Sequence, residues 1–214
     1  TDEMKVAPNA FVSALPAKIT MLRALAQLNA GEVTLRNNEF ALVGNASSKV
    51  LAREITGHVT QIANGYSGTA NISYPAPPPN EFGVAVDDGP IDDLSQCQVL
   101  FADALSKNDI LFASNRADIG RASHGFLDFL ADLATKCGAY SLQVGGHTDI
   151  SGDASYNVFL SQNRADAVMQ YLVDNGVSDT RLTAIGFGEN QPICTQNTSA
   201  CYAQNRRIEI TVEQ

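Results

Sequence analysis

A proline-rich, acidic run near the middle of the chain constrains the fold more than any other feature of the sequence. Residues 76–93 carry five acidic side chains and no basic one. Five prolines lie in this run or directly beside it: Pro75, Pro77, Pro78, Pro79 and Pro90. Proline disrupts helices and central strands, and like charges extend a chain. The run is therefore predicted to be a linker between two domains, over residues 1–75 and 94–214.

The overall charge of the chain argues against one large class of partners. The 214 residues hold 14 lysines and arginines against 23 aspartates and glutamates, a net charge of −9. Nucleic acids and anionic lipid surfaces repel such a chain, so no nucleic-acid partner is expected. No stretch of the sequence approaches the ~18 consecutive apolar residues of a membrane-spanning helix.

The first residues, Thr1-Asp2-Glu3, lack the basic and apolar segments of a signal peptide. We expect any signal peptide or membrane anchor to lie upstream of Thr1. A β-barrel, a lipidated cysteine and an inner-membrane helix are all compatible with the sequence as that upstream segment, and each would attach the chain to a membrane.

The first domain is predicted to be a two-layer α+β sandwich with the element order αββαβ. Its apolar side chains recur first at helical and then at strand spacing, and Asn37-Asn38 marks a hairpin turn. The predicted elements are a helix over residues 16–29, strands over 32–36 and 39–43, a helix from Ser47-Ser48 to Ile62 and a strand over 69–73.

This element order, with a short Val-x-Leu hairpin followed by Gly44, resembles the BON domain family. The resemblance implies envelope and phospholipid contacts, although no particular residue carries that chemistry over. A small structural spacer domain is the alternative interpretation of residues 1–75.

The second domain alternates helices and strands, which predicts an α/β sandwich of two layers. Its first part contains a helix around Leu94–Leu105, a short strand over residues 110–112, a helix over about 122–134 and a strand over 140–144. Its second part contains a long helix from Ala154 to Asp174, a strand over Leu182–Gly186 and a last strand over residues 208–212.

The long helix breaks the usual apolar pattern at its start. Projected back toward the N-terminus, its inner apolar stripe meets three polar side chains, Asn157, Ser161 and Arg164. The helix also follows a strand that ends at Asp149, a place where α/β folds often bind ligands. Asp149 and Arg164 are thus predicted to face one pocket. They could form a structural ion pair, or they could receive the ammonium and carboxylate groups of a zwitterion.

Four ordered motifs resemble the OmpA-like peptidoglycan-binding domain over about residues 94–214. The motifs are Gly146-His147-Thr148-Asp149, Tyr156-Asn157-x-x-Leu160-Ser161-x-x-Arg164-Ala165, Arg181-Leu182-x-x-x-Gly186-Phe187-Gly188-Glu189-x-x-Pro192 and Asn205-Arg206-Arg207-Ile208-Glu209. The resemblance implies a βαβαβ-type fold with a mixed sheet.

The same resemblance implies a ligand and a set of binding residues. Asp149 and Arg164 match the positions that hold the diaminopimelate side chain of the peptidoglycan stem peptide, and Thr148, Asn157 and Arg206 would lie near it. The loop Ser114-Asn115 would rim the pocket. The implied function is non-covalent tethering of an envelope membrane to the wall, in the periplasm of a Gram-negative-type bacterium and in association with the outer membrane or envelope.

The four cysteines are predicted to form two disulfides. Cys194 and Cys201 flank a polar stretch, which leaves Cys97 to pair with Cys137 and points to an oxidising compartment. The longer loop would stabilise the fold by about 3–4 kcal/mol. Four reduced, buried thiols are the alternative. The cysteines and histidines lack the spacing of a zinc site, so no metal site is expected.

Two other classes of function remain open on the sequence alone. A hydrolase of wall peptides would need a catalytic site, but the chain has no G-x-S-x-G nucleophile elbow and no dinucleotide-binding loop, so neither catalysis nor a cofactor is expected. An envelope interaction or oligomerisation module, with the main role carried by the N-terminal domain, is the second alternative.

Overall fold

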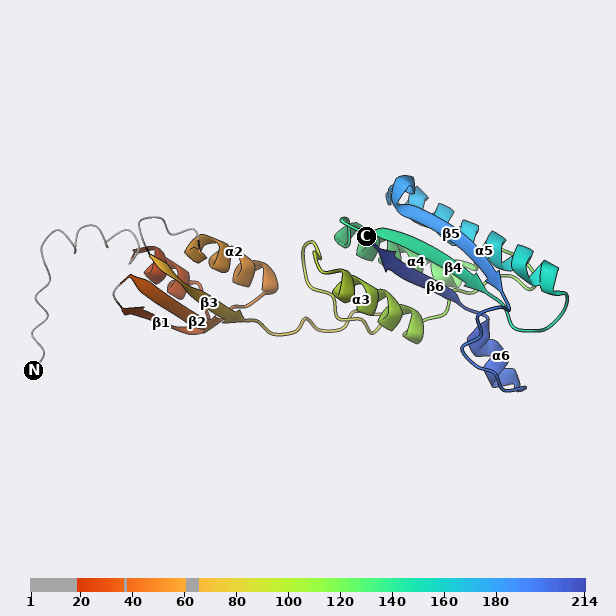
Figure 1. Cartoon of the computed structure of the whole chain (residues 1–214), viewed down its shortest axis with the longest axis horizontal. Helices are drawn as coiled ribbons and strands as arrows, with labels where there is room; N and C mark the ends of the chain where they lie inside the picture. Colours follow the sequence, from red (N-terminus) through yellow and green to blue (C-terminus); the bar gives the residue numbers. More distant parts are fainter. Residues whose placement is uncertain (1–18, 37, 61–65) are drawn as a thin grey trace, which may run out of the picture. The chain divides into compact units, whose positions relative to one another are not determined.

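The computed structural model describes residues 19–36, 38–60 and 66–214. The chain divides into two compact units, Thr1–Pro77 and Pro78–Gln214 (Figure 1). Each unit has its own hydrophobic core and its own three-stranded sheet.

The first unit has the predicted order αββαβ. Its sheet contains β1 (Ala30–Arg36), β2 (Glu39–Asn45) and β3 (Ser67–Ser73), and its helices are the segment over residues 19–26 and α2 (Lys49–Thr60). β1 and β2 form the predicted antiparallel hairpin, and β3 pairs with β2 in parallel. Residues 16–18, Asn37 of the predicted turn and Ile62 lie outside the described residues. The resemblance to the BON family stays a prediction.

The core of the first unit forms where the helices cover one face of the sheet. Alternation along β2 buries Phe40 and Leu42, and Met21, Ile55 and Val59 come from the two helical segments. A sheet with one apolar face needs such a helical layer, because an isolated hairpin is only marginally stable in water.

The second unit is built on a mixed sheet, as predicted. Its strands are β4 (Ser141–His147), β5 (Leu182–Gly188) and β6 (Ile208–Glu213), in the order β5-β4-β6. β4 pairs with β5 in parallel and with β6 in antiparallel register. Along β6 the even-numbered side chains are buried and the odd-numbered ones are exposed, so one face of the sheet meets the core.

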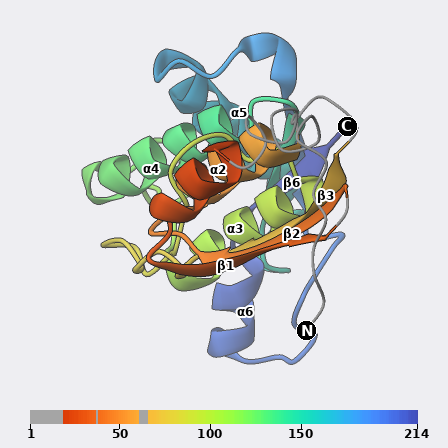
Figure 2. The ribbon, with the colours of Figure 1, turned by 90° about the vertical axis from the view of Figure 1, so that its left-hand side faces the viewer.

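Four α-helices accompany this sheet: α3 (Leu94–Lys107), α4 (His124–Lys136), α5 (Ala154–Asp174) and α6 (Ser199–Asn205). Two short 3-10 helices, η1 (Arg121–Ser123) and η2 (Asp179–Arg181), complete the unit. α5 packs on β4 and β5, and α3 packs on β6. The bounds of α5 are those predicted. α6 was not predicted. It projects from the unit in both views (Figures 1 and 2), and Figure 1 shows it near the end of the sheet.

Glycines bring α5 unusually close to the sheet. A Cβ on Gly146 would lie 2.1 Å from the Ser161 carbonyl oxygen, and a Cβ on Gly186 would lie 2.3 Å from the Gln162 amide nitrogen. No side chain fits at either position, so the start of α5 rests directly on the backbone of β4 and β5.

Two glutamine amides occupy the outer edges of the sheet. Gln98 donates to the Ile210 carbonyl (3.1 Å) and accepts from the Val212 amide (2.8 Å) on β6. On the opposite edge, Gln162 donates to the Ala184 carbonyl (3.0 Å) and accepts from the Gly186 amide (2.7 Å) of β5. Each side chain therefore pairs with the strand as one residue of a further parallel strand would.

The strand predicted over residues 110–112 was wrong. The segment makes a single bridge between Phe112 and Ile119 and joins neither sheet. It folds back on itself instead, because the Ala113 amide donates to the Asp118 carbonyl (3.0 Å) and the Gly120 amide donates to the Leu111 carbonyl (2.8 Å). These bonds satisfy the backbone groups that a sheet would otherwise pair.

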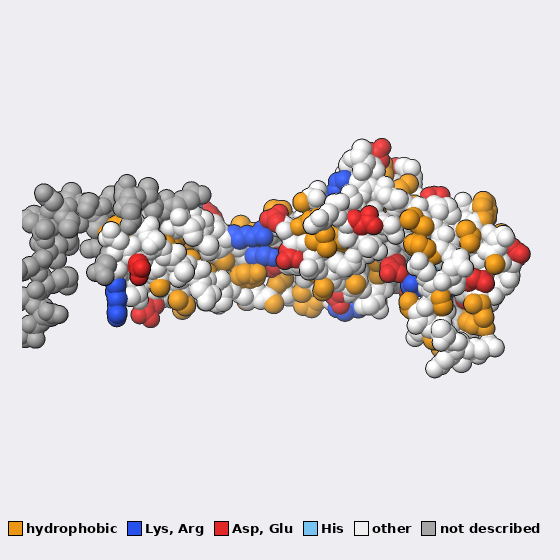
Figure 3. Space-filling model, in the orientation of Figure 1, with side chains coloured by type: hydrophobic (Ala, Val, Ile, Leu, Met, Phe, Trp, Pro, Cys, Tyr) orange, Lys and Arg blue, Asp and Glu red, His pale blue; other side chains and the backbone are white. Residues whose placement is uncertain are grey.

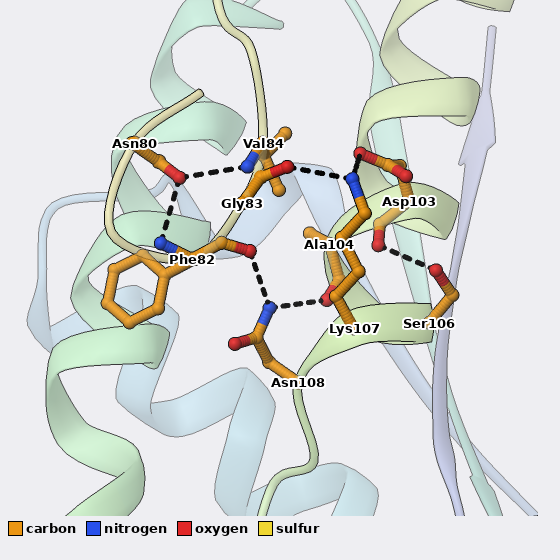
Figure 4. Close-up of polar contacts among 9 residues, drawn as sticks. All are labelled: Asn80, Phe82, Gly83, Val84, Asp103, Ala104, Ser106, Lys107 and Asn108. Atoms are coloured by element: carbon orange, nitrogen blue, oxygen red, sulfur yellow. Dashed lines mark hydrogen bonds and ion pairs between the residues drawn. The ribbon is translucent and has the colours of Figure 1, made fainter. Parts of the chain in front are cut away.

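Most of the run predicted to be a linker packs within the second unit. Val84 and Ile91 are buried in its core. Asn80 accepts hydrogen bonds from the amides of Phe82 and Val84, which closes a tight loop (Figure 4). Figure 4 also shows two side chains from the end of α3 bound to this loop: Lys107 donates to the Gly83 carbonyl and Asn108 donates to the Phe82 carbonyl. Residues 78–93 are thus an extended N-terminal segment of the second unit that is hydrogen-bonded to the end of α3.

Both predicted disulfides are present. Cys97–Cys137 joins α3 to the end of α4, with a Cα–Cα distance of 6.1 Å. Cys194–Cys201 joins the loop after β5 to α6, with a Cα–Cα distance of 5.2 Å. The second bridge therefore closes the segment that leads into Arg206.

The surface shown in Figure 3 carries acidic side chains scattered among apolar and uncharged ones. Across the described part of the chain, no helix combines the length and the apolar character that crossing a bilayer would require.

Candidate functional site

Four of the predicted site residues lie around the end of β4, where the strand leads into the loop before α5: Thr148, Asp149, Asn157 and Arg206. Asp149 is buried there, and its carboxylate accepts two hydrogen bonds, from the Ser151 amide (2.8 Å) and from Arg206 Nη1 (2.5 Å). Burial raises the pKa of the Asp149 carboxyl, but these hydrogen bonds outweigh it and hold the pKa below its usual value of 3.8. Asp149 is therefore an anion at neutral pH.

Arg164 lies on the inner stripe of α5 and is half-buried. Its Nε donates to the Arg116 carbonyl (3.0 Å), and its guanidinium lies over the Phe112 ring, 5.0 Å from the ring centroid. Burial lowers the pKa of Arg164 and the nearby charge of Arg206 lowers it further, while Tyr156 opposes them. Arginine stays protonated in proteins, so Arg164 is a fixed, oriented cation.

Arg164 and Arg206 line the same pocket, which has a volume of about 240 Å³. The rest of its lining comes from Asp109, residues 110–112 and Ala203. Asp149 does not line the pocket itself and is connected to it through Arg206. The predicted alternative of an ion pair between Asp149 and Arg164 is not what the described residues form, because Asp149 pairs with Arg206 instead.

Asn157 fixes the loop after β4 to the start of α5. Its side chain is 4% exposed and its Nδ2 donates to the carbonyls of Asp149 (3.3 Å) and Ser151 (3.1 Å) and to Glu189 Oε2 (2.8 Å). Asn157 therefore holds the backbone of Asp149 in place and is not among the residues that line the pocket. This arrangement explains why a polar residue continues the apolar stripe of the helix.

Thr148 is buried, and its amide donates to the Gly188 carbonyl (2.9 Å), which ties the end of β4 to β5. Its hydroxyl has no hydrogen-bond partner in the described part of the chain. Thr148 is next to Asp149 in the sequence but is not among the residues that line the pocket.

His147 is packed into the fold. Its ring stacks on Phe187 with 5.0 Å between ring centroids, and its Nε2 lies 3.3 Å from Glu209 Oε2. Burial lowers the pKa of His147 to about 4, with repulsion from Arg207 acting in the same direction and Glu209 opposing it. The ring is thus neutral at physiological pH, and its contacts lie with β5 and β6.

The loop over residues 113–118 contributes backbone groups that the sequence motifs did not reveal. The Asn115 carbonyl accepts from Tyr156 Oη (3.2 Å), and the Arg116 carbonyl accepts from Arg164. Asn115 has a positive φ of 54°, which the turn requires. Ser114-Asn115 was predicted to rim the pocket; neither residue is among those that line it, and the loop instead contacts two residues of α5.

Other contributions were also missing from the sequence-based prediction: Asp109, Phe112 and Ala203 in the pocket, and Glu189 behind it. The motif Gly-Phe-Gly-Glu contained a signal for Glu189, since it follows β5 at the same end of the sheet. Within the described ranges, no group of histidine, cysteine, aspartate or glutamate side chains could hold a metal ion.

Residues 111–206 match the OmpA family and form an OmpA family domain. They contain the pocket arginines Arg164 and Arg206 as well as Asp149 and Asn157.

Individual relatives match about half of the chain. Outer membrane porin F of Pseudomonas fluorescens is 42% identical over 105 residues, which cover 49% of this chain and 32% of the porin. Peptidoglycan-binding protein ArfA of Mycobacterium bovis is 32% identical over 124 residues, covering 58% of this chain and 37% of that protein. The chain thus spans about a third of the length of these two relatives.

A solved structure is also similar, that of the peptidoglycan-associated lipoprotein from Burkholderia pseudomallei. It is 28% identical, with a TM-score of 0.46, and the match covers 51% of this chain and 92% of that one.

Proposed function

We propose that the second unit binds peptidoglycan non-covalently, by holding the diaminopimelate of the stem peptide between Asp149, Arg164 and Arg206. The observation that carries this proposal is the pair of guanidinium groups lining one pocket beside a buried, ionised carboxylate. The side chain of diaminopimelate ends in an ammonium and a carboxylate on one carbon, so it presents both charges that this arrangement complements.

Each charged group has a defined task in the proposal. Arg164 presents a planar fork of N–H donors to the ligand carboxylate, because the Arg116 carbonyl and the Phe112 ring hold its guanidinium in place. Asp149 accepts from the ligand ammonium. Its two oxygens offer about four acceptor positions, and Ser151 and Arg206 do not use all of them, so the ion pair with Arg206 leaves room for the ligand.

The relatives support the coarser part of the proposal. One is named a peptidoglycan-binding protein and another is named an outer membrane porin, and each matches about half of this chain. We therefore propose that the chain ties an envelope membrane to the wall, in the periplasm of a Gram-negative-type bacterium, through a membrane anchor outside this sequence. The function proposed is binding rather than hydrolysis.

Pelleting with isolated sacculi tests the proposal. The wild type should sediment with the sacculi, and Asp149→Ala and Arg164→Ala should each reduce the affinity at least tenfold, since truncating one partner of a desolvated charge pair costs about 2–5 kcal/mol. Asp174→Ala and Arg121→Ala remove the same charges at exposed positions away from the pocket and serve as matched controls. Unchanged pelleting of the two pocket variants would refute the site.

A second experiment tests the ligand. Free diaminopimelate should bind in a calorimetric titration, and acetylation of its amines should weaken binding because Asp149 would lose its cation. Equal affinity for the acetylated and free forms would contradict the role of Asp149. Release of soluble stem fragments from the sacculi would favour a hydrolase instead.

A further inference from the structure

The candidate pocket continues into a larger one beside β6. This second pocket has a volume of about 370 Å³ and lies between α3, the segment 203–207 and β6. It shares Asp109, Ala203 and Arg206 with the candidate pocket. A smaller hollow, also bordered by Asp109 and Arg206, adjoins both. Asp109 and Arg206 thus border all three hollows.

One wall of the second pocket is the outer edge of β6. The Arg207 carbonyl accepts from the His147 amide, so the odd-numbered residues of β6 direct their backbone groups toward β4. The even-numbered residues Ile208, Ile210 and Val212 direct theirs outward, because backbone groups alternate along a strand. The bonds that Gln98 makes to Ile210 and Val212 agree with this alternation.

The edge is only partly covered. Gln98 occupies the pair formed by the Ile210 carbonyl and the Val212 amide. The equivalent pair one step closer to Arg206 is formed by the Ile208 carbonyl and the Ile210 amide. Both residues line the second pocket, and neither group has a hydrogen-bond partner among the described residues. The free pair has the geometry that Gln98 already shows to suit an amide.

We propose that this second pocket binds the main chain of the stem peptide next to the diaminopimelate, with one peptide residue bonded to the Ile208 carbonyl and the Ile210 amide. The inference rests on the proposed function, because the occupant is identified by its continuity with the ligand held at Arg206. Ala102, Leu105 and Ile193 supply apolar walls beside charged and polar ones, a mixed lining that suits a short peptide.

The test compares two ligands on two matched variants. Ala102 is exposed on α3 and lines the second pocket but not the candidate pocket, so Ala102→Trp should fill the former alone. Val99→Trp places the same side chain on an exposed position of α3 outside both pockets and serves as the control. The ligands are free diaminopimelate and a stem tripeptide that ends in diaminopimelate, titrated calorimetrically.

The tripeptide should bind the wild type and Val99→Trp about tenfold more tightly than free diaminopimelate, the gain expected from two added hydrogen bonds. Ala102→Trp should lose this gain while its affinity for free diaminopimelate stays unchanged. Equal affinity of Ala102→Trp and the wild type for the tripeptide would overturn the inference and leave the proposed function intact. Failure of free diaminopimelate to bind the wild type would overturn both.

Amide hydrogen exchange gives a readout that does not depend on the variants. In the wild type the Ile210 amide should exchange more slowly with the tripeptide bound than with free diaminopimelate bound. Identical exchange in the two complexes would contradict the proposal. So would a wild-type dimer that Ala102→Trp abolishes, because it would assign the edge of β6 to a second copy of the chain.

Discussion

Replacing Gly146 by alanine tests whether direct contact between helix and sheet holds the site together. The new methyl carbon would lie 2.1 Å from the Ser161 carbonyl oxygen, a backbone atom that cannot rotate away. Ordinary contact begins at 3.4 Å, so α5 would have to move away from β4 by about 1.3 Å. Overpacking of this kind costs about 1–3 kcal/mol, and we expect the upper end because the obstacle is backbone.

The movement would also disturb the bonds that Ser161 makes. Its hydroxyl accepts from the Gly188 amide (2.9 Å) and donates to the Val158 carbonyl (2.9 Å), so it ties the start of α5 to the end of β5. Arg164 lies one turn further along the same helix. We therefore expect Gly146→Ala to weaken binding to sacculi as well as to lower stability.

Urea denaturation followed by circular dichroism measures the change in the free energy of unfolding. Gly125→Ala is the matched control, since it adds the same methyl group to α4, where the nearest atom would be Phe82 Cζ at 3.9 Å. That control should stabilise the protein by about 0.5–1 kcal/mol, the usual gain for alanine over glycine in a helix. A Gly146→Ala variant as stable as Gly125→Ala would refute the close-contact argument.

Three further predictions follow from buried groups. The pKa of His147 is about 4 in the folded protein and 6.5 in the unfolded chain, so as the pH falls the unfolded chain takes up the proton first. The free energy of unfolding should therefore keep its full value above pH 6.5 and decrease by up to about 3 kcal/mol between pH 6.5 and pH 4. His147→Gln should flatten this decrease in a series of urea titrations at different pH values. Asn157→Ala removes three hydrogen bonds at a buried position, so it should lower the free energy of unfolding by about 1–3 kcal/mol in thermal denaturation. The variant should also bind sacculi more weakly. Retention of full affinity would show that the hydrogen bonds of Asn157 are not needed to position Asp149. Replacing Cys97 and Cys137 together by alanine opens a loop of 40 residues and should lower the free energy of unfolding by about 4 kcal/mol. An unchanged free energy of unfolding would mean that the packing of α3 and α4 does not depend on the disulfide.

The long elements of the fold could be predicted because their periodicity extends over many residues. The bounds of α5 were correct, and so were the buried polar positions Asn157 and Ser161 on its inner stripe. Phe159, an apolar residue that lies off this stripe, is 62% exposed. A helix of 21 residues repeats its pattern often enough to fix both its type and its inner face.

Short elements could not be predicted in the same way. α6 has seven residues, and its position depends on the Cys194–Cys201 bridge and on Asn205, whose side chain accepts from the amides of Ile193 and Cys194. Such tertiary bonds leave little periodic signal. Residues 110–112 have the composition of a strand, but a local turn takes their backbone bonds.

The arginine that pairs with Asp149 could not be predicted from the sequence either. The sequence placed Asp149 and Arg164 at one pocket, but which arginine touches the carboxylate depends on where the chain returns 57 residues later. Local spacing along α5 carries no information about that return. The structure gives the contact to Arg206, while Arg164 is held by a backbone carbonyl and an aromatic ring.

The two glutamine amides at the edges of the sheet have a consequence for the behaviour of the protein in a crowded compartment. A three-stranded sheet has two outer strands, each able to recruit another chain and begin aggregation. The Gln98 side chain hydrogen-bonds to one carbonyl and one amide on the outer edge of β6, and the Gln162 side chain does the same on β5. These carbonyl and amide groups are therefore not available to a strand from another chain. Pairing of the sheet with another chain is therefore restricted to the parts of each edge that these side chains leave free.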